Sequence, residues 1–294
     1  MPLTSSWTKD TFETRNQLPD PIQTILMRCK KDISIALDVW KQILVTLFGG
    51  NLIIAYAKGS AVKPWESNID YVPILSDLDI HILLESPHKT FFTEDTTNAI
   101  ETALQNSEKY ETLFFEANPG NAHLPRIQVM FIEDLKLDPN YVPPLEEQCR
   151  MIIGQWKALE YPSEDEIRLR DKKSLLAQDE FIRQLPKKIF DRTDLDFWQT
   201  LRQISWRVSP SPYRVLTNLC PKDNPLKIWT WNRTSVYNRL REIGCGQLAK
   251  NYKRYYEVGW DLFRTDFRDT PGFRSIVRFG NQILQECLDK VKDR

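Results

Sequence analysis

The sequence predicts an α+β fold, with a small mixed β-sheet in the first half of the chain and helices alone in the second. Apolar, β-branched runs at residues 52–57 and 126–132 have the length of buried strands. Residues 76–84 alternate between polar and apolar side chains, as a strand with two different faces does. After residue 145 the apolar residues recur at helical spacing. We therefore expect an N-terminal arm at residues 1–21, a sheet domain at 22–140 and an all-helical domain at 141–294.

The sheet domain should open with a long helix. Pro19-Asp20-Pro21 is a helix-start pattern, apolar residues follow at helical spacing from Ile22 to Phe48, and Gly49-Gly50 ends the run. A second helix is predicted at residues 93–109. Residues 112–116 and 126–132 flank a Pro-Gly-Asn loop, so we expect two antiparallel strands that complete a sheet of about four strands.

The second half of the chain reads as a series of helices. Ser163 and Glu166 form a capping-box pattern that opens a charged helix, and Pro186 should break that helix. The predicted helices span residues 145–160, 163–185, 195–208, 213–219, 235–243, 247–263 and 271–291. Their aromatic residues and arginines are typical of a helical bundle with a solvated outer side.

Composition places the chain among ordinary globular proteins. At 294 residues and 41% hydrophobic content, it is long enough to bury the cores of two domains. Five widely spaced cysteines show no zinc or disulfide spacing, and the polar N-terminus lacks the apolar core of a signal sequence. No apolar run reaches the length of about 18 residues that a membrane span needs. We expect a cytoplasmic protein with reduced thiols and no membrane partner.

Charge is divided unevenly along the chain although the net charge is zero. Residues 1–150 carry 13 Lys and Arg against 21 Asp and Glu, whereas residues 151–294 carry 27 against 19. Such asymmetry indicates either two electrostatically matched halves or a basic half that faces a polyphosphate or a nucleic acid. We favour two electrostatically matched halves, or a polyphosphate partner, over a nucleic acid.

The residues that suggest chemistry lie between positions 52 and 84. The first strand is followed by Gly59-Ser60, where glycine lets the backbone approach a phosphate and the serine hydroxyl donates to it. On the next strand, Asp77 and Asp79 share one face. Neighbouring carboxylates repel each other unless a cation binds them, and hard oxygen ligands favour Mg²⁺. Such a cation takes its remaining ligands from water and substrate phosphates.

This motif resembles the core signature of the DNA polymerase beta-type nucleotidyltransferase superfamily. The matching residues are Gly59, Ser60, Ser76, Asp77 and Asp79. The resemblance implies that the Gly-Ser pair, with Ser76, positions the phosphates of a nucleotide. It further implies that the two aspartates are catalytic and hold Mg²⁺ or Mn²⁺, and that residues 22–140 form a nucleotidyltransferase-like domain.

One position departs from the superfamily pattern, which usually carries a third acid on a late strand. The matching slot holds Gln128, whose amide oxygen can contact a metal but supplies no charge and takes no proton. Three readings are open. Glu116 or Glu133 supplies the carboxylate from a shifted position, the acceptor or a water fills the gap, or the domain binds nucleotide without efficient transfer.

Three further residues near the motif have weaker support from the sequence. Lys63, in the spacer after the turn, is a candidate phosphate contact, and Asp70 has similar rank. A lysine in such a spacer is more often simply exposed. His81 shares the face of the two aspartates, but a hydrogen-bonded histidine under a helix is the simpler reading.

The expected function is Mg²⁺-dependent transfer of a nucleoside monophosphate from an NTP to a hydroxyl acceptor, with release of pyrophosphate. The acceptor is a small molecule, a protein or an RNA, and fold analogy does not choose among them. The competing expectation is a catalytically weak or inactive nucleotide-binding protein with a regulatory, antitoxin-like role.

Overall fold

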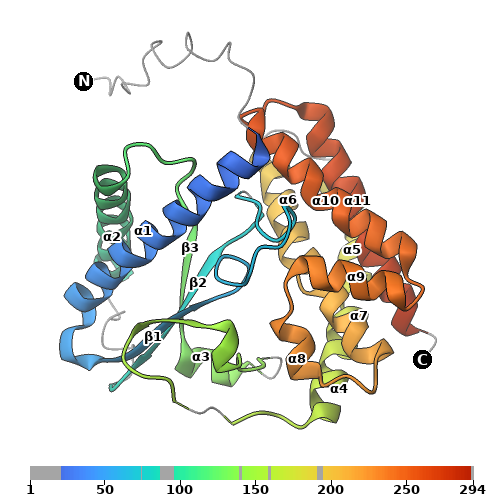
Figure 1. Cartoon of the computed structure of the whole chain (residues 1–294), viewed down its shortest axis with the longest axis horizontal. Coiled ribbons are helices and arrows are strands. Elements are labelled where there is room, and N and C mark those ends of the chain that lie inside the picture. Colours follow the sequence, from blue (N-terminus) through green and yellow to red (C-terminus); the bar gives the residue numbers. More distant parts are fainter. Residues whose placement is uncertain are drawn as a thin grey trace.

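The protein consists of an N-terminal region with a mixed four-stranded sheet and a mostly helical C-terminal region, which confirms the predicted α+β class (Figure 1). The computed structural model describes residues 21–73, 75–86, 96–138, 141–157, 160–190 and 195–292, without the side chains of residues 195–197. The predicted N-terminal arm therefore lies outside the described residues except for Pro21.

The sheet has the strand order β3-β2-β1-β4. Its strands are β1 (Leu52–Lys58), β2 (Leu78–Leu84), β3 (Ile127–Phe131) and β4 (Arg150–Ile153). The first three match predicted strands. β1 is antiparallel to β2 and β4, whereas β2 and β3 are parallel. The register places Lys58 opposite Asp79 and Gln128 beside Asp79, so these three residues meet at one end of the sheet.

Helices α1 (Ile22–Phe48) and α2 (Thr96–Ala117) pack against each other, and α1 crosses the sheet. The bounds of α1 are those predicted. The predicted strand at 112–116 is wrong, because α2 continues through it. Tyr110 and Phe114, four residues apart, are both buried on one side of that helix. As a result β3 pairs in parallel with β2 instead of antiparallel with residues 112–116.

The fourth strand comes from a segment that the sequence assigns to a helix. The predicted helix at 145–160 is wrong: a short 3-10 turn at Glu146–Gln148 is followed by β4. Met151 lies opposite Tyr56 on β1. Both belong to a small apolar cluster, with Ile132 of α3 (Ile132–Leu137), on the face of the sheet turned away from α1.

The C-terminal region is built of helices, as predicted. They are α4 (Glu164–Leu176), α5 (Gln178–Phe190), α6 (Leu195–Val208), α7 (Ser211–Leu219), α8 (Pro225–Thr230), α9 (Arg233–Glu242), α10 (Gly246–Arg264) and α11 (Thr270–Lys292). The capping box of Ser163 and Glu166 is present at the start of α4. The single predicted helix at 163–185 is two helices, and Pro186 lies inside α5 instead of ending it.

The spacer between β1 and β2 forms the seam with the helical region. Gly259 of α10 lets the spacer approach closely, because a Cβ there would lie 2.7 Å from the Leu75 side chain. The neighbouring Trp260 is fully buried, and its indole N–H donates to the Asn68 carbonyl at 2.6 Å. Val72 and Leu75 belong to the same apolar core as the helices of both regions. The sheet and the helices therefore share one continuous core.

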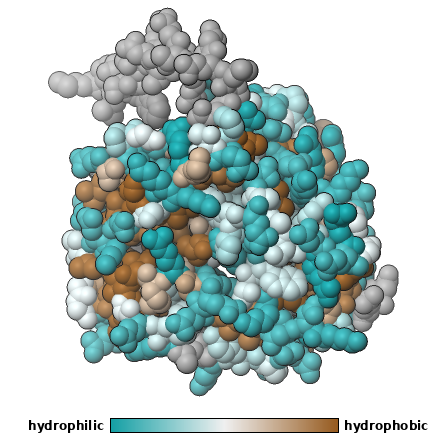
Figure 2. Space-filling model, in the orientation of Figure 1, coloured by the Kyte–Doolittle hydropathy of each residue, from teal (hydrophilic) through white to brown (hydrophobic). Residues whose placement is uncertain are grey.

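Apolar side chains also reach the surface on the side of the molecule where α1 and α2 lie (Figure 2). Met27 and Val45 of α1 and Ile100 and Leu104 of α2 are at least half exposed. Residues 22–51 are long and apolar enough, by length and composition, to cross a membrane. One side of α1 packs into the core, and the cytoplasmic location stays a prediction.

Candidate functional site

The chain turns sharply after β1 at Gly59, whose φ is +90°. A side chain is strained at this φ, and a Cβ there would lie 3.0 Å from Oδ2 of Asp79. The N–H groups of Val62 and Lys63 both donate to the Gly59 carbonyl, which closes a compact turn. The structure thus brings the predicted Gly-Ser turn into contact with one of the two predicted acids.

A buried arginine of α9 holds the hydroxyl of Ser60. Arg233 Nη2 donates to Ser60 Oγ at 3.3 Å, and Nη1 donates to Ser76 Oγ and to the Ile69 carbonyl, both at 3.1 Å. Because Ser60 Oγ accepts this bond, its own proton can be donated to a ligand oxygen. Ser76 is 1% exposed, and its hydroxyl also accepts from the Val72 N–H, so it fixes the spacer instead of facing a ligand.

Asp79 is the predicted acid that lies beside the turn. Lys58 is its partner across β1 and β2, and Gln128 is its partner across β2 and β3. Burial raises the pKa of Asp79 to about 6, while Lys58 lowers this pKa and Asp77 raises it. Ionised Asp79 is therefore a costly group in the folded protein, and a positive charge close to it lowers that cost.

Asp77, the second predicted acid, is bound by two arginines of the protein. The guanidinium of Arg126, just before β3, contacts Oδ1. Nη2 of Arg202, on α6, contacts Oδ2 at 3.3 Å. The Asp77 side chain is only 15% exposed. Both carboxylate oxygens of Asp77 thus have cationic partners from two different parts of the chain.

Gln128 occupies the place at which the resemblance implies a third acid. It lies beside Asp79 in register, and its side chain is exposed. Glu116 is on the exposed side of α2. Glu133 accepts from the N–H of Leu84, at the opposite end of β2. The structure therefore places neither glutamate at the end of the strand where Asp79 lies.

This set of side chains does not suit Mg²⁺. A hard dication needs oxygen ligands with excess negative charge. Here Asp77 and Asp79 are accompanied by Lys58, Arg126 and Arg202, and the charges of the last three all lower the pKa of Asp79. Two carboxylates thus lie among three cationic side chains, and Gln128, at the position of the superfamily's third acid, is neutral. Mg²⁺ or Mn²⁺ stays a prediction that the arrangement of these side chains does not support.

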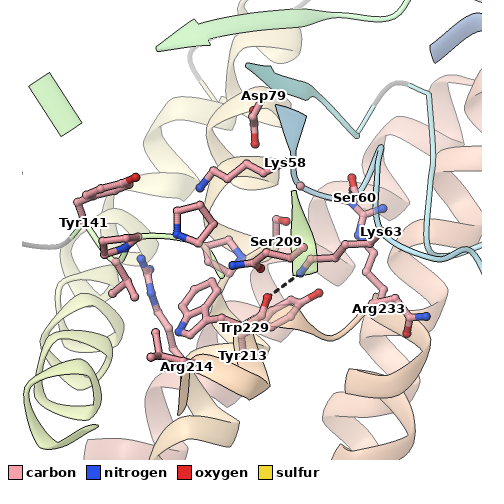
Figure 3. A pocket seen from close by; sticks show the side chains of 18 of the residues that line it. Lys58, Ser60, Lys63, Asp79, Tyr141, Ser209, Tyr213, Arg214, Trp229 and Arg233 are labelled. Carbon is pink, nitrogen blue, oxygen red and sulfur yellow. Dashed lines mark hydrogen bonds between the residues drawn. The ribbon is translucent and has the colours of Figure 1, made fainter. Parts of the chain in front are cut away.

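Lys63 reaches the helical region instead of turning to the Gly-Ser turn. Its ammonium donates to the carbonyls of Trp229 at 2.7 Å and Trp231 at 2.8 Å, and the first of these bonds is drawn in Figure 3. It also lies 5.0 Å from the ring centre of Tyr213. Burial, together with nearby Lys58, lowers the pKa of Lys63 to about 7. This lysine ties the spacer to the helices.

The turn and Asp79 line a cleft of about 370 Å³ between the end of the sheet and the helical region (Figure 3). Lys58 and Ser60 share one wall with Asp79. Across the cleft, the rings of Trp229 and Tyr213 are stacked, with centres 5.3 Å apart and planes 11° apart. A polar wall opposite an aromatic one can accommodate a ligand that has an anionic end and a planar end.

Four basic residues of this region are missing from the sequence-based set. Lys58 and Arg126 precede the predicted motif residues Gly59 and Gln128 by one and two positions, and the register of β1, β2 and β3 places them at the same end of the sheet. Arg202 and Arg233 come from the helical half. Their signals in the sequence are the excess of positive charge in that half and its richness in arginine and aromatic residues.

The described residues contain another group of metal-capable side chains, Cys29, Asp32 and His123, in the core. The Asp32 carboxylate already accepts from Asn118 Nδ2, from two backbone N–H groups and from His123 Nδ1. His123 Nε2 is hydrogen-bonded to the Tyr71 hydroxyl at 2.7 Å. Burial raises the pKa of the Cys29 thiol well above its ordinary range. Asp32 and His123 thus form a buried hydrogen-bonded pair. His81 is also buried, with Nδ1 hydrogen-bonded to the Tyr56 hydroxyl and Nε2 without a hydrogen-bond partner among the described residues.

Comparison of the chain with profiles of known protein families, with curated proteins and with solved structures finds no match.

We expect Asp79→Asn to raise the free energy of unfolding by up to about 3 kcal/mol at neutral pH. The pKa of Asp79 rises on folding from 3.8 to about 6, so the stability that this group contributes is full below 3.8 and is lost as pH rises through 6. Asparagine has no group that ionises in this range, so the Asp79→Asn protein does not lose this stability as pH rises. Urea unfolding of both proteins from about pH 4 to about pH 8 measures it. A stability difference that stays the same across this range would contradict the prediction.

Proposed function

We propose that the protein binds a nucleoside triphosphate in the cleft and transfers its nucleotide weakly or not at all, so that it acts as a nucleotide-binding regulatory or interaction protein. The resemblance of the Gly59-Ser60 turn and its acid strand to the nucleotidyltransferase superfamily supports a nucleotide as ligand. The half-buried Trp229 on the cleft wall supports it as well, because an indole ring can contact a flat nucleobase, whereas Tyr213, which stacks on Trp229, is only 7% exposed.

The observation that most supports weak or absent transfer is the pair of arginines bound to Asp77. Nucleotidyl transfer depends on metal ions that neutralise charge developing on the phosphates and activate the attacking hydroxyl. Asp77 is committed to Arg126 and Arg202, and the third slot is Gln128. The second metal ligand and the third acid that the superfamily mechanism uses are therefore both compromised.

The transferase is the second candidate function. The contact between Gly59 and Asp79, with Gln128 in register beside Asp79, is the arrangement expected of the superfamily site. For this function Asp77 would have to exchange its arginines for a metal ion. The two candidates share the same ligand and differ in turnover, so one experiment separates them.

That experiment measures binding and chemistry on the same samples. Each of the four ribonucleoside triphosphates is titrated into the purified chain by calorimetry, and pyrophosphate release is then followed with Mg²⁺ or Mn²⁺ and candidate hydroxyl acceptors. We expect binding of at least one NTP and no pyrophosphate above the level of Asp79→Asn. Pyrophosphate release that Asp79→Asn abolishes would favour the transferase.

Gly59→Val serves as the control for the position of the ligand. Its side chain would enter the space of the Asp79 carboxylate at a φ that valine disfavours, so the turn must move. NTP binding should be lost while the unfolding transition remains cooperative. Undiminished binding by a folded Gly59→Val protein would place the ligand elsewhere.

A further inference from the structure

We propose that the cleft takes its triphosphate without a divalent cation, and that the ammonium of Lys58 supplies the positive charge that a metal ion would supply. This inference rests on the proposed function, because it concerns how the same ligand is neutralised. It follows from which cations surround Asp79 and which of them are available.

The cationic groups of the cleft differ in their availability. The structure describes Lys58 and three other basic side chains on the cleft wall. The first of these three, Lys63, donates to two backbone carbonyls. Arg214 pairs with Asp171, with Nε 3.7 Å from Oδ1. Arg233 is 3% exposed and is hydrogen-bonded to Ser60, Ser76 and the backbone. Each of these three side chains is therefore already in contact with polar or charged groups of the protein itself.

Lys58 is different, since its ammonium makes no hydrogen bond or ion pair with any residue in the described part of the chain. It lies on β1 directly before Gly59 and lines the cleft together with Ser60. In Figure 3 its side chain runs below the Asp79 carboxylate and into the cleft. An incoming phosphate at the turn would thus meet an unpaired ammonium on a rigid strand, next to a serine hydroxyl that can donate.

Lys58 also lies directly across the strand pair from Asp79, the acid that a metal ion would need as a ligand. Its charge acts on Asp79 more strongly than that of any other group, ahead of Asp77, Arg126 and Arg202. A dication bound to Asp79 would lie against this ammonium, which opposes its binding. The same ammonium attracts a free triphosphate. The structure therefore favours the uncomplexed anion over its Mg²⁺ complex.

The two modes of binding predict opposite effects of one substitution. If a metal bridges Asp79 and the phosphates, Asp79→Asn removes a ligand and weakens binding. If no metal is present, the Asp79 carboxylate repels the phosphates, and Asp79→Asn strengthens binding. The sign of the change in Kd thus reports whether a cation lies between the acid and the ligand.

The test is calorimetric titration of ATP, and of the NTP that binds best if another is preferred, in excess EDTA and in excess MgCl₂. For the parent protein we expect a Kd in EDTA no weaker than in MgCl₂. Lys58→Met should weaken binding by about 10-fold or more, as loss of a charge-assisted hydrogen bond does. Lys58→Arg should retain most of the affinity, and Asp79→Asn should tighten it by about 3-fold in EDTA.

Lys250→Met is the matched control, because it removes the same charge from the exposed side of α10, away from the cleft lining. Its Kd should equal that of the parent. Binding that requires MgCl₂ and is lost in Asp79→Asn would overturn the metal-free mode and leave the proposed function standing. Absence of NTP binding in both media would overturn the proposed function and this inference with it.

Discussion

Asp77→Asn is expected to lower the free energy of unfolding by about 2 kcal/mol, because it leaves two guanidinium groups without their anionic partner. Arg126 and Arg202 approach different oxygens of this carboxylate from the start of β3 and from α6. The pairs are partly exposed, so the expected cost is below that of a fully buried pair. Urea unfolding at neutral pH measures it, and added salt should reduce the difference.

Asp79→Asn is the informative comparison, because the two aspartates lie two positions apart, Asp77 directly before β2 and Asp79 within it. If both acids were simply waiting for a metal ion, asparagine at either position would relieve repulsion and stabilise the protein. Instead we expect destabilisation at Asp77 and stabilisation at Asp79. An Asp77→Asn protein as stable as the parent would show that its arginine pairs contribute nothing, and would reopen Asp77 as a metal ligand.

Asp70→Ala is expected to lower the free energy of unfolding by about 3 kcal/mol, because four donors lose their acceptor. The Asp70 side chain is buried, and its oxygens accept from the N–H groups of Glu66, Ser67 and Thr234 and from the Thr234 hydroxyl, all at 2.8 Å. These bonds join the spacer to the start of α9. Unpaired N–H groups in such a place cost far more than exposed ones.

Thr234→Val provides the control for Asp70, since it removes one hydroxyl donor and keeps the size of the side chain. It should cost about 2 kcal/mol, because the Thr234 hydroxyl donates to Asp70 and is also hydrogen-bonded to the Ser67 hydroxyl at 2.7 Å. Thermal and urea unfolding of both variants give the comparison. If Asp70→Ala costs no more than Thr234→Val, the backbone bonds to Asp70 are not important to the seam between the two regions.

Much of the fold could be predicted from the sequence, because residue periodicity records which side of an element is buried. The long α1 and the strands β1, β2 and β3 follow from such local patterns. Two short apolar segments were misassigned, one helical segment as a strand and one strand as part of a helix, because periodicity alone does not distinguish them. Residues 112–116 are a short apolar run within a helix, and residues 150–153 form a short strand whose apolar residues also fit a helical template.

The candidate site could be predicted only where it depends on one strand and its turn. The Gly-Ser turn and the two acids follow from local spacing and alternation, whereas the place of Gln128 follows only from the resemblance to the superfamily. The arginines on Asp77 do not, because they lie 49 and 125 residues away from it in the chain. Long-range pairs of this kind leave no periodic trace, and the charge excess of the second half indicates only that cations are present.

The origin of β4 has a consequence for work with parts of the chain. Residues 150–153 lie beyond residue 140, yet they cover one side of β1 in the sheet. A fragment that stops at residue 140 would expose the bare backbone donors and acceptors of a central, apolar strand. Such an unprotected edge promotes aggregation, so a soluble fragment should retain residues up to at least Ile153.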